Sequence, residues 1–153
     1  MKQRVNYTAV APEAFKALLG VEEYVRKTGL DYKMIELVKI RVSQINGCAY
    51  CLDMHTIDTR AHGETEQRIY CLPAWRESPF YTDQERAALE MAEAVTLIST
   101  NGVSDELYQK VREQFSEKEF IDLLMAIIAI NSWNRLAISS NAIPGNYKPA
   151  LKK

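Results

Sequence analysis

The sequence lacks the features that identify several classes of protein. Its 19 basic and 20 acidic residues nearly cancel and form no basic block, so nothing indicates nucleic acid or an anionic membrane as a partner. The longest apolar run, residues 123–130, is too short to span a bilayer. There is no persuasive strand alternation, no glycine-rich phosphate loop and no repeat. These absences leave an all-α fold without a nucleotide-binding motif.

Cysteine is also scarce, and its scarcity bears on the compartment. Three cysteines are too few for a disulfide scaffold, and residues 1–20 contain no continuous apolar segment because Glu13 and Lys16 interrupt it. We therefore expect a reducing, cytoplasmic location. The 153 residues are enough for one compact multi-helix domain. We expect that domain to span residues 1–153, with an irregular or extended arm over about 1–10 and a loose tail over about 142–153.

Apolar spacing and helix caps predict where the helices lie. Pro12 suits a first turn, Asp31 can cap a helix, and two capping boxes begin at Thr82 and Ser116. The last helix is apolar nearly all round, which indicates a central helix or one covered by a partner subunit. The predicted helices cover residues 12–27, 31–46, 48–62, 64–71, 82–98, 105–115 and 116–138.

The stretch from Asn46 to His55 is the only part of the sequence that specifies a chemistry. Asn46-Gly47 ends one helical pattern, so Cys48 and Cys51 are expected at the start of the next helix. The free N–H groups and the dipole at that position favour a thiolate. His55 lies one turn after Cys51 and can take its thiol proton, while Cys48 is close enough to form a disulfide.

Two plainer interpretations compete with a redox pair. Cys48, Cys51, His55 and His62 could together ligate a structural zinc ion, although such sites usually draw ligands from two separated segments. Alternatively, the cysteines could be small buried hydrophobes, as we expect for the isolated Cys71. In that case His62 would simply complement the dipole at the end of its helix. We favour the redox interpretation.

The residues from Glu36 to His55 resemble the core signature of the AhpD-like branch of the carboxymuconolactone decarboxylase family. The run reads E-L-V-x-I-R-V-S-x-I-N-G-C-A-Y-C-x-x-x-H, with the glutamate, both cysteines and the histidine at the family's spacing. A second stretch, residues 131–136, is similar to the family's C-terminal helix. Together the similar segments extend from about Met34 to Pro144.

The resemblance implies a thiol-dependent peroxidase active in antioxidant defence. Cys51 would attack a hydroperoxide, Cys48 would resolve the product as a disulfide, and His55 would take the thiol proton. Spacing alone would place Glu36 on the polar side of its helix, solvated, but the resemblance assigns it to a proton relay with His55. No cofactor is implied. The implied partners are a lipoyl-bearing or thioredoxin-like dithiol reductant and further copies of the chain in a homo-oligomer.

One departure from the family leaves alternatives open. Tyr50 stands where some members of the group carry a second histidine, and a phenol is a poor base near neutrality. A disulfide carrier or redox sensor without peroxidase turnover would tolerate this change. The decarboxylase branch would not need the C-x-x-C motif. Asn134 and Arg135, at the end of the last apolar run, would line the pocket or make a subunit contact.

Overall fold

Residues 2–100 and 102–149, which the computed structural model describes, form eight α-helices, one 3₁₀ turn and no strand. The prediction of an all-α fold is confirmed. The elements are α1 (Tyr7–Val10), α2 (Pro12–Arg26), α3 (Tyr32–Asn46), α4 (Ala49–Ala61), α5 (Glu66–Cys71), the 3₁₀ turn η1 (Leu72–Ala74), α6 (Asp83–Thr96), α7 (Asp105–Gln114) and α8 (Glu117–Ser140).

Local side-chain chemistry sets most of the helix boundaries. The hydroxyls of Thr82 and Ser116 each accept a backbone N–H in a complete capping box, which begins α6 and α8 respectively. Asp31 accepts the N–H of Met34 at 2.8 Å and begins α3. Gly47 ends α3 with a φ of 69°, a left-handed conformation that glycine adopts at little cost. These boundaries agree with those expected from the sequence.

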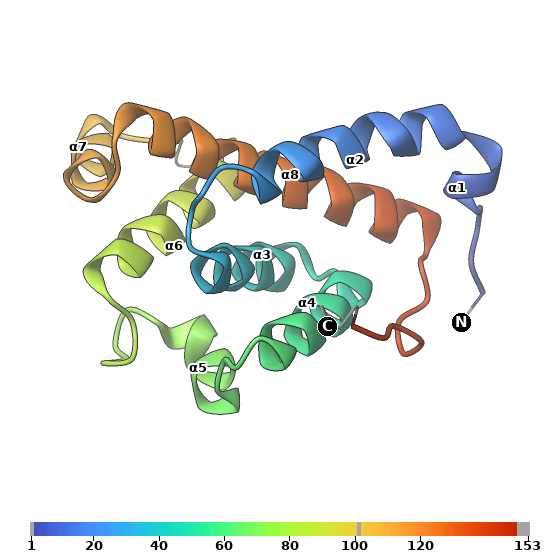
Figure 1. The fold of residues 1–153 in the computed structure, drawn as a ribbon, viewed down its shortest axis with the longest axis horizontal. Helices are drawn as coiled ribbons and strands as arrows, with labels where there is room; N and C mark the ends of the chain where they lie inside the picture. The colour runs from blue at the N-terminus through green and yellow to red at the C-terminus, as the bar shows by residue number, and fades with distance from the viewer. Residues whose placement is uncertain (1, 101, 150–153) are drawn as a thin grey trace.

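Helix α3 is the centre of the molecule. It packs against α4, α6 and α8, while α2 lies along α8 on the side away from α4 and α5 (Figure 1). Because neighbours surround α3, every residue from 34 to 43 except Arg41 is buried, polar ones included. Glu36 is therefore not solvated, and the helical-wheel expectation for it is wrong.

Helix α8 combines a buried face with an exposed apolar one. Leu123, Ile127 and Ile130 are fully buried in the core, whereas Ile128 and Ile138 are 42% and 44% exposed. Among the described helices, α8 is long and apolar enough to cross a membrane, but half of its apolar window is buried in the fold, as in core helices. A single copy of the chain therefore leaves one face of α8 exposed to solvent.

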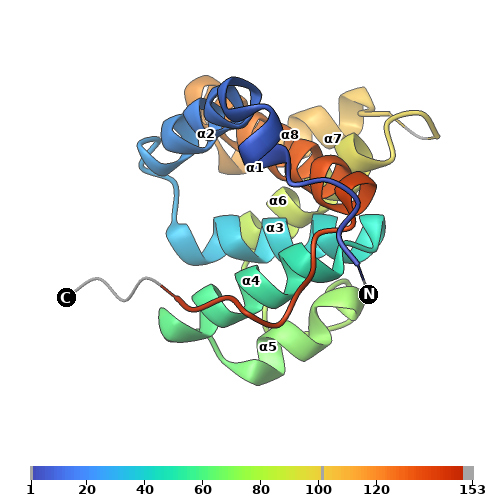
Figure 2. The ribbon, with the colours of Figure 1, turned by 90° about the vertical axis from the view of Figure 1, so that its right-hand side faces the viewer.

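Within the described residues, the N-terminal arm contains a helix and the C-terminal tail makes contacts with α4. The arm was expected to be irregular or extended, but it contains α1, which begins at Asn6 because that side chain accepts the N–H of Ala9. After α8 the tail turns back and runs across α4 (Figure 2). There Gly145 donates its N–H to Asp53, and the hydroxyl of Tyr147 lies 2.8 and 2.9 Å from the carboxylate oxygens of Asp58. Residues 150–153 of the expected tail lie outside the described residues.

Candidate active site

The cysteine pair lies at the first turn of α4. Cys48 is the N-cap residue, with φ −86° and ψ 92°, and its Sγ accepts the backbone N–H of Cys51 at 3.3 Å. Sulfur thus occupies the place that a Ser or Asp oxygen usually fills at a helix start. Both cysteines are free thiols and are almost completely buried. The predicted position of the pair at the start of a helix is confirmed.

The hydrogen bonds around the pair distinguish the two sulfurs. The S–H of Cys51 donates to Cys48 and lowers the pKa of the Cys48 thiol to about 7, although burial opposes the shift. The backbone N–H groups of Cys51 and Tyr50 and the side chain of Asn134 lower it further. The same S–H donation, followed by burial, raises the pKa of the Cys51 thiol. These hydrogen bonds favour Cys48 as the sulfur that ionises first, whereas the sequence interpretation assigned the attacking thiolate to Cys51.

Glu36 and His55 form a second pair beside the cysteines. Oε2 of Glu36 lies 2.8 Å from Nδ1 of His55, and both side chains are buried. Burial would raise the pKa of Glu36, but the charge and hydrogen bond of His55, with those of Lys39, hold it at about 2. Glu36 is thus a carboxylate, which accepts hydrogen bonds only.

The four predicted residues therefore meet in one place as two hydrogen-bonded pairs. His55 follows Cys51 by one helical turn, on the same face of α4. Within the described part of the chain, no hydrogen bond joins His55 to either sulfur. The arrangement provides a dithiol in which the pKa of one thiol is lowered to about 7, and a buried imidazole oriented by a carboxylate.

Two further contributors were missed or left undecided by the sequence. Lys39 contacts Glu36, and the only signal for it was its spacing of one helical turn from Glu36. Asn134 and Arg135 are now distinguished: Asn134 is fully buried at the cysteine pair, while Arg135 is exposed and hydrogen-bonds to Asn131.

Tyr50 is half-buried next to the cysteines and lies within electrostatic reach of a second tyrosine, Tyr7 of α1. Burial, Tyr50 and the two thiols together raise the pKa of Tyr7, which places Tyr7 within electrostatic reach of the pair. Tyr7 also lines a groove of about 440 Å³ between α1, α2 and α8, whose walls include Phe15, Leu136 and Arg135.

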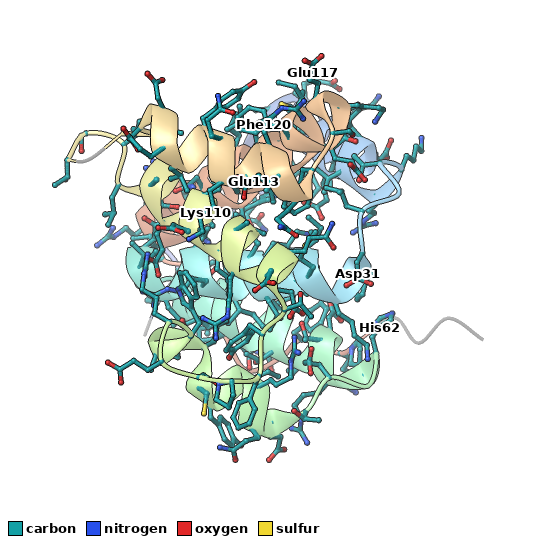
Figure 3. All side chains as sticks on the ribbon, turned by 90° about the vertical axis from the view of Figure 1, so that its left-hand side faces the viewer. Asp31, His62, Lys110, Glu113, Glu117 and Phe120 are labelled. Carbon is teal, nitrogen blue, oxygen red and sulfur yellow. The ribbon has the colours of Figure 1, made fainter. Side chains whose placement is uncertain are left out.

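The four-ligand zinc site is not assembled in the described residues. His62 lies at the edge of the molecule beside the start of α3 (Figure 3), where its ring stacks on Tyr32 at 4.3 Å and its Nδ1 lies 2.8 Å from the carbonyl oxygen of Asp58. Among residues 2–100 and 102–149, no three His, Cys, Asp or Glu side chains gather as metal ligands. Cys71 is partly exposed rather than a core residue, and Gln67 donates to its sulfur at 3.4 Å.

The chain is similar to known proteins over most of its length. Residues 12–94 match the carboxymuconolactone decarboxylase family. The uncharacterized protein YdfG of Bacillus subtilis (strain 168) is 52% identical over 139 residues, which are 91% of this chain and 95% of YdfG. The uncharacterized protein YnjA of Escherichia coli (strain K12) is 27% identical over 78% of this chain and 64% of its own length.

Solved structures share the fold as well. A protein of unknown function from Agrobacterium tumefaciens, named as a candidate antioxidant defence protein AhpD, superposes with a TM-score of 0.91 and 44% identity, over 95% of this chain and all of that one. The debrominase Bmp8 superposes with a TM-score of 0.76 over 88% of this chain and 73% of its own, but at 20% identity it shows the fold alone. This chain has the AhpD-like helical fold and belongs to the carboxymuconolactone decarboxylase family.

Proposed function

We propose that the protein is a thiol-dependent peroxidase that reduces hydroperoxides with the Cys48–Cys51 dithiol. One observation carries the proposal: a buried, reduced C-x-x-C pair sits at a helix start, with the pKa of one thiol lowered to about 7, beside a carboxylate–imidazole pair. A low thiol pKa increases the fraction of the nucleophilic form at neutral pH. The match to the family and the AhpD-named relative support the same conclusion.

The reaction needs no bound cofactor. One thiolate attacks the terminal oxygen of ROOH, the O–O bond breaks, and RO⁻ leaves and takes up a proton as ROH. The resulting sulfenic acid is attacked by the second thiol, which forms the disulfide and releases water. A dithiol partner, lipoyl-bearing or thioredoxin-like, then exchanges with the disulfide and restores both thiols. His55 would carry the protons, and Glu36 would orient it.

The lowered pKa of its thiol favours Cys48 as the attacking sulfur. Cys48 is already the more acidic thiol, whereas Cys51 would first have to pass its proton to Cys48 or His55. The order expected from the sequence, in which Cys51 attacks because it lies one turn from His55 and Cys48 resolves, stays a prediction. Both orders give the same disulfide and differ only in which sulfur becomes the sulfenic acid.

A second candidate function is a disulfide carrier or sensor without peroxidase turnover. Tyr50 favours it, because a phenol in the place of a relay histidine removes one base from the site. The buried dithiol would serve this function equally well, since exchange with a partner disulfide requires no hydroperoxide. A peroxidase would consume hydroperoxide at the same rate as it oxidises the dithiol reductant, whereas a carrier or sensor would not consume hydroperoxide.

The test measures free thiols and sulfenic acid after addition of tert-butyl hydroperoxide, with and without dihydrolipoamide. A Cys71→Ser background removes the third thiol, which lies outside the pair. We expect this parent to form an intramolecular disulfide and to turn over when the dithiol is present. Cys51→Ser should stop at a sulfenic acid on Cys48, and Cys48→Ser should react slowly.

The two single variants also test the order of attack. A sulfenic acid that accumulates on Cys51 in the Cys48→Ser variant, with Cys51→Ser inert, would restore the order expected from the sequence. A parent that exchanges with dithiols but ignores hydroperoxides would favour the carrier. A parent that does neither would refute the redox function.

A further inference from the structure

A buried lysine, Lys39, links the Glu36–His55 pair to Glu22 on α2. Nζ of Lys39 lies 3.2 Å from Oε1 of Glu36, the carboxylate oxygen that does not bind His55. The same Nζ lies 2.5 Å from Oε1 of Glu22 on α2. Lys39 is only 4% exposed, and Glu22 and Glu36 are buried with it. Glu22, Lys39, Glu36 and His55, from three helices, thus form one buried network of ionisable side chains.

In this network, the charge of Lys39 and the charges of Glu22 and Glu36 stabilise one another. A buried ammonium stays charged only when it is paired, and Lys39 has two carboxylates as partners. Burial favours the neutral form of Lys39, but Glu36 and Glu22 outweigh it and raise its pKa. The ammonium of Lys39 donates one hydrogen bond to Glu22 and also contacts Oε1 of Glu36. Oε2 of Glu36 is left to accept from His55.

We propose that Lys39 is a positioning residue for the redox pair. By binding Oε1 it keeps Glu36 a carboxylate, whose Oε2 can only accept a hydrogen bond and so requires the proton of His55 on Nδ1. Nε2 of His55 is then the basic nitrogen that serves the thiols. The link to thiol chemistry rests on the proposed function, but the position of the imidazole proton does not.

His55 lowers the pKa of Glu36 by its charge and its hydrogen bond, and Lys39 adds a second cation; the remaining groups near Glu36 supply no positive charge to it. Two phenols lie within electrostatic reach of the Glu36 carboxylate. Tyr32 is on the same helix, α3, and Tyr147 is in the tail, where its hydroxyl binds Asp58. Burial, followed by nearby carboxylates, raises the pKa of each phenol, that of Tyr147 to about 12, so both stay neutral. On α2, Arg26 reaches only Glu22, at 3.9 Å. Apart from His55, Lys39 is therefore the cation that stabilises the Glu36 carboxylate among the described residues.

The test follows the proton on His55 directly. The chain has two histidines, so a His62→Gln background leaves one imidazole to observe by ¹⁵N NMR. In this parent at pH 8 we expect the Nδ1–H tautomer. Lys39→Met should allow Glu36 to take up a proton and donate to Nδ1, which raises the Nε2–H fraction severalfold. The acid side of the pH profile for peroxide-dependent thiol loss should move to higher pH.

Two further variants separate positioning from stability. Lys39→Met leaves the buried carboxylate of Glu22 with only the distant Arg26, at 3.9 Å. The double variant Glu22→Gln/Lys39→Met should therefore recover thermal stability while keeping the altered tautomer and the shifted pH profile. Glu22→Gln alone retains Lys39 and should keep the parent tautomer. Recovery of the parent tautomer in the double variant, or no change of tautomer in Lys39→Met, would refute the proposal. If the parent ignores hydroperoxides, the proposed function fails, but the tautomer still tests Lys39.

Discussion

The side-chain oxygen of Asn134 accepts a hydrogen bond of 2.9 Å from Nδ2 of Asn46, 88 residues earlier in the chain. This contact joins α8 to the last residue of α3, directly before the turn that leads to Cys48. The amide nitrogen of Asn134 donates in turn to the hydroxyl of Ser43 at 3.0 Å. The same side chain lowers the pKa values of both thiols. Helix α8 thus takes part in the site that the motif on α3 and α4 begins.

We predict that Asn134→Ala raises the pKa of the Cys48 thiol, because the thiolate loses a donor in a buried site. The pH dependence of iodoacetamide alkylation measures this value, with the parent half-reactive near pH 7 and the variant at higher pH. Asn131→Ala is the matched control, since Asn131 also binds Asn46 but does not contact the sulfurs. Equal shifts in both variants would show that the asparagine contacts act only on the fold.

Glu36 should make the unfolding free energy of the protein fall as the pH is lowered. Its pKa in the folded protein, about 2, lies below the ordinary value of 4.5, so its stabilising effect is complete above pH 4.5 and is lost as the pH falls through 2. In Glu36→Gln this effect is absent, while Lys39 keeps its contact with Glu22. We expect the difference in unfolding free energy between parent and variant to shrink by about 3 kcal/mol from pH 5 to pH 2. Urea titrations across that range measure it, and a constant difference would contradict the prediction.

Where local chemistry determines structure, the sequence predicted it well. The capping boxes at Thr82 and Ser116 and the glycine stop at Gly47 need only neighbouring residues, and all three lie where they were expected. The placement of Cys48 at the start of α4 follows from the same local signals. The family resemblance supplied the pairing of Glu36 with His55, which spacing alone would not have given.

Where distant segments decide the outcome, the sequence failed. The helical wheel treated α3 as buried on one face, but α4, α6 and α8 surround it, so Glu36 and Lys39 are enclosed as well. The N-terminal arm also contacts the end of α8, where Arg4 donates its N–H to the carbonyl oxygen of Ser140 at 2.9 Å. Neither relationship leaves a pattern in the local sequence.

The tail should contribute measurably to stability. Tyr147→Phe removes the hydroxyl that binds both oxygens of Asp58, and a hydrogen bond to a charged group contributes about 1.5 to 3 kcal/mol when well buried. Because this pair is only partly buried, we expect a loss of about 1 kcal/mol and a fall in Tm of about 3 °C. Tyr108→Phe is the control, since no hydrogen bond of its hydroxyl is found among the described residues. Equal Tm values for the two variants would show that the tail contact adds nothing.

The exposed apolar face of α8 leads to a prediction about assembly. Ile121 and Ile128 are 49% and 42% exposed and lie two turns apart on the helix, with the half-buried Leu124 between them. The expected homo-oligomer would cover this face, because exposed apolar side chains in a row are typical of subunit contacts. An aspartate placed there would be buried without a partner in the assembly but solvated in the single chain.

Ile128→Asp should therefore lower the mass in solution while leaving the helical circular dichroism of the chain unchanged. Light scattering coupled to size-exclusion chromatography measures the mass. Leu124→Asp should dissociate or misfold the protein, because Leu124 also packs against the core. Tyr70→Asp is the control, since Tyr70 is 68% exposed on α5, far along the chain from α8. A parent that is already monomeric, or an Ile128→Asp variant with the parent's mass, would mean that this face is not the subunit contact.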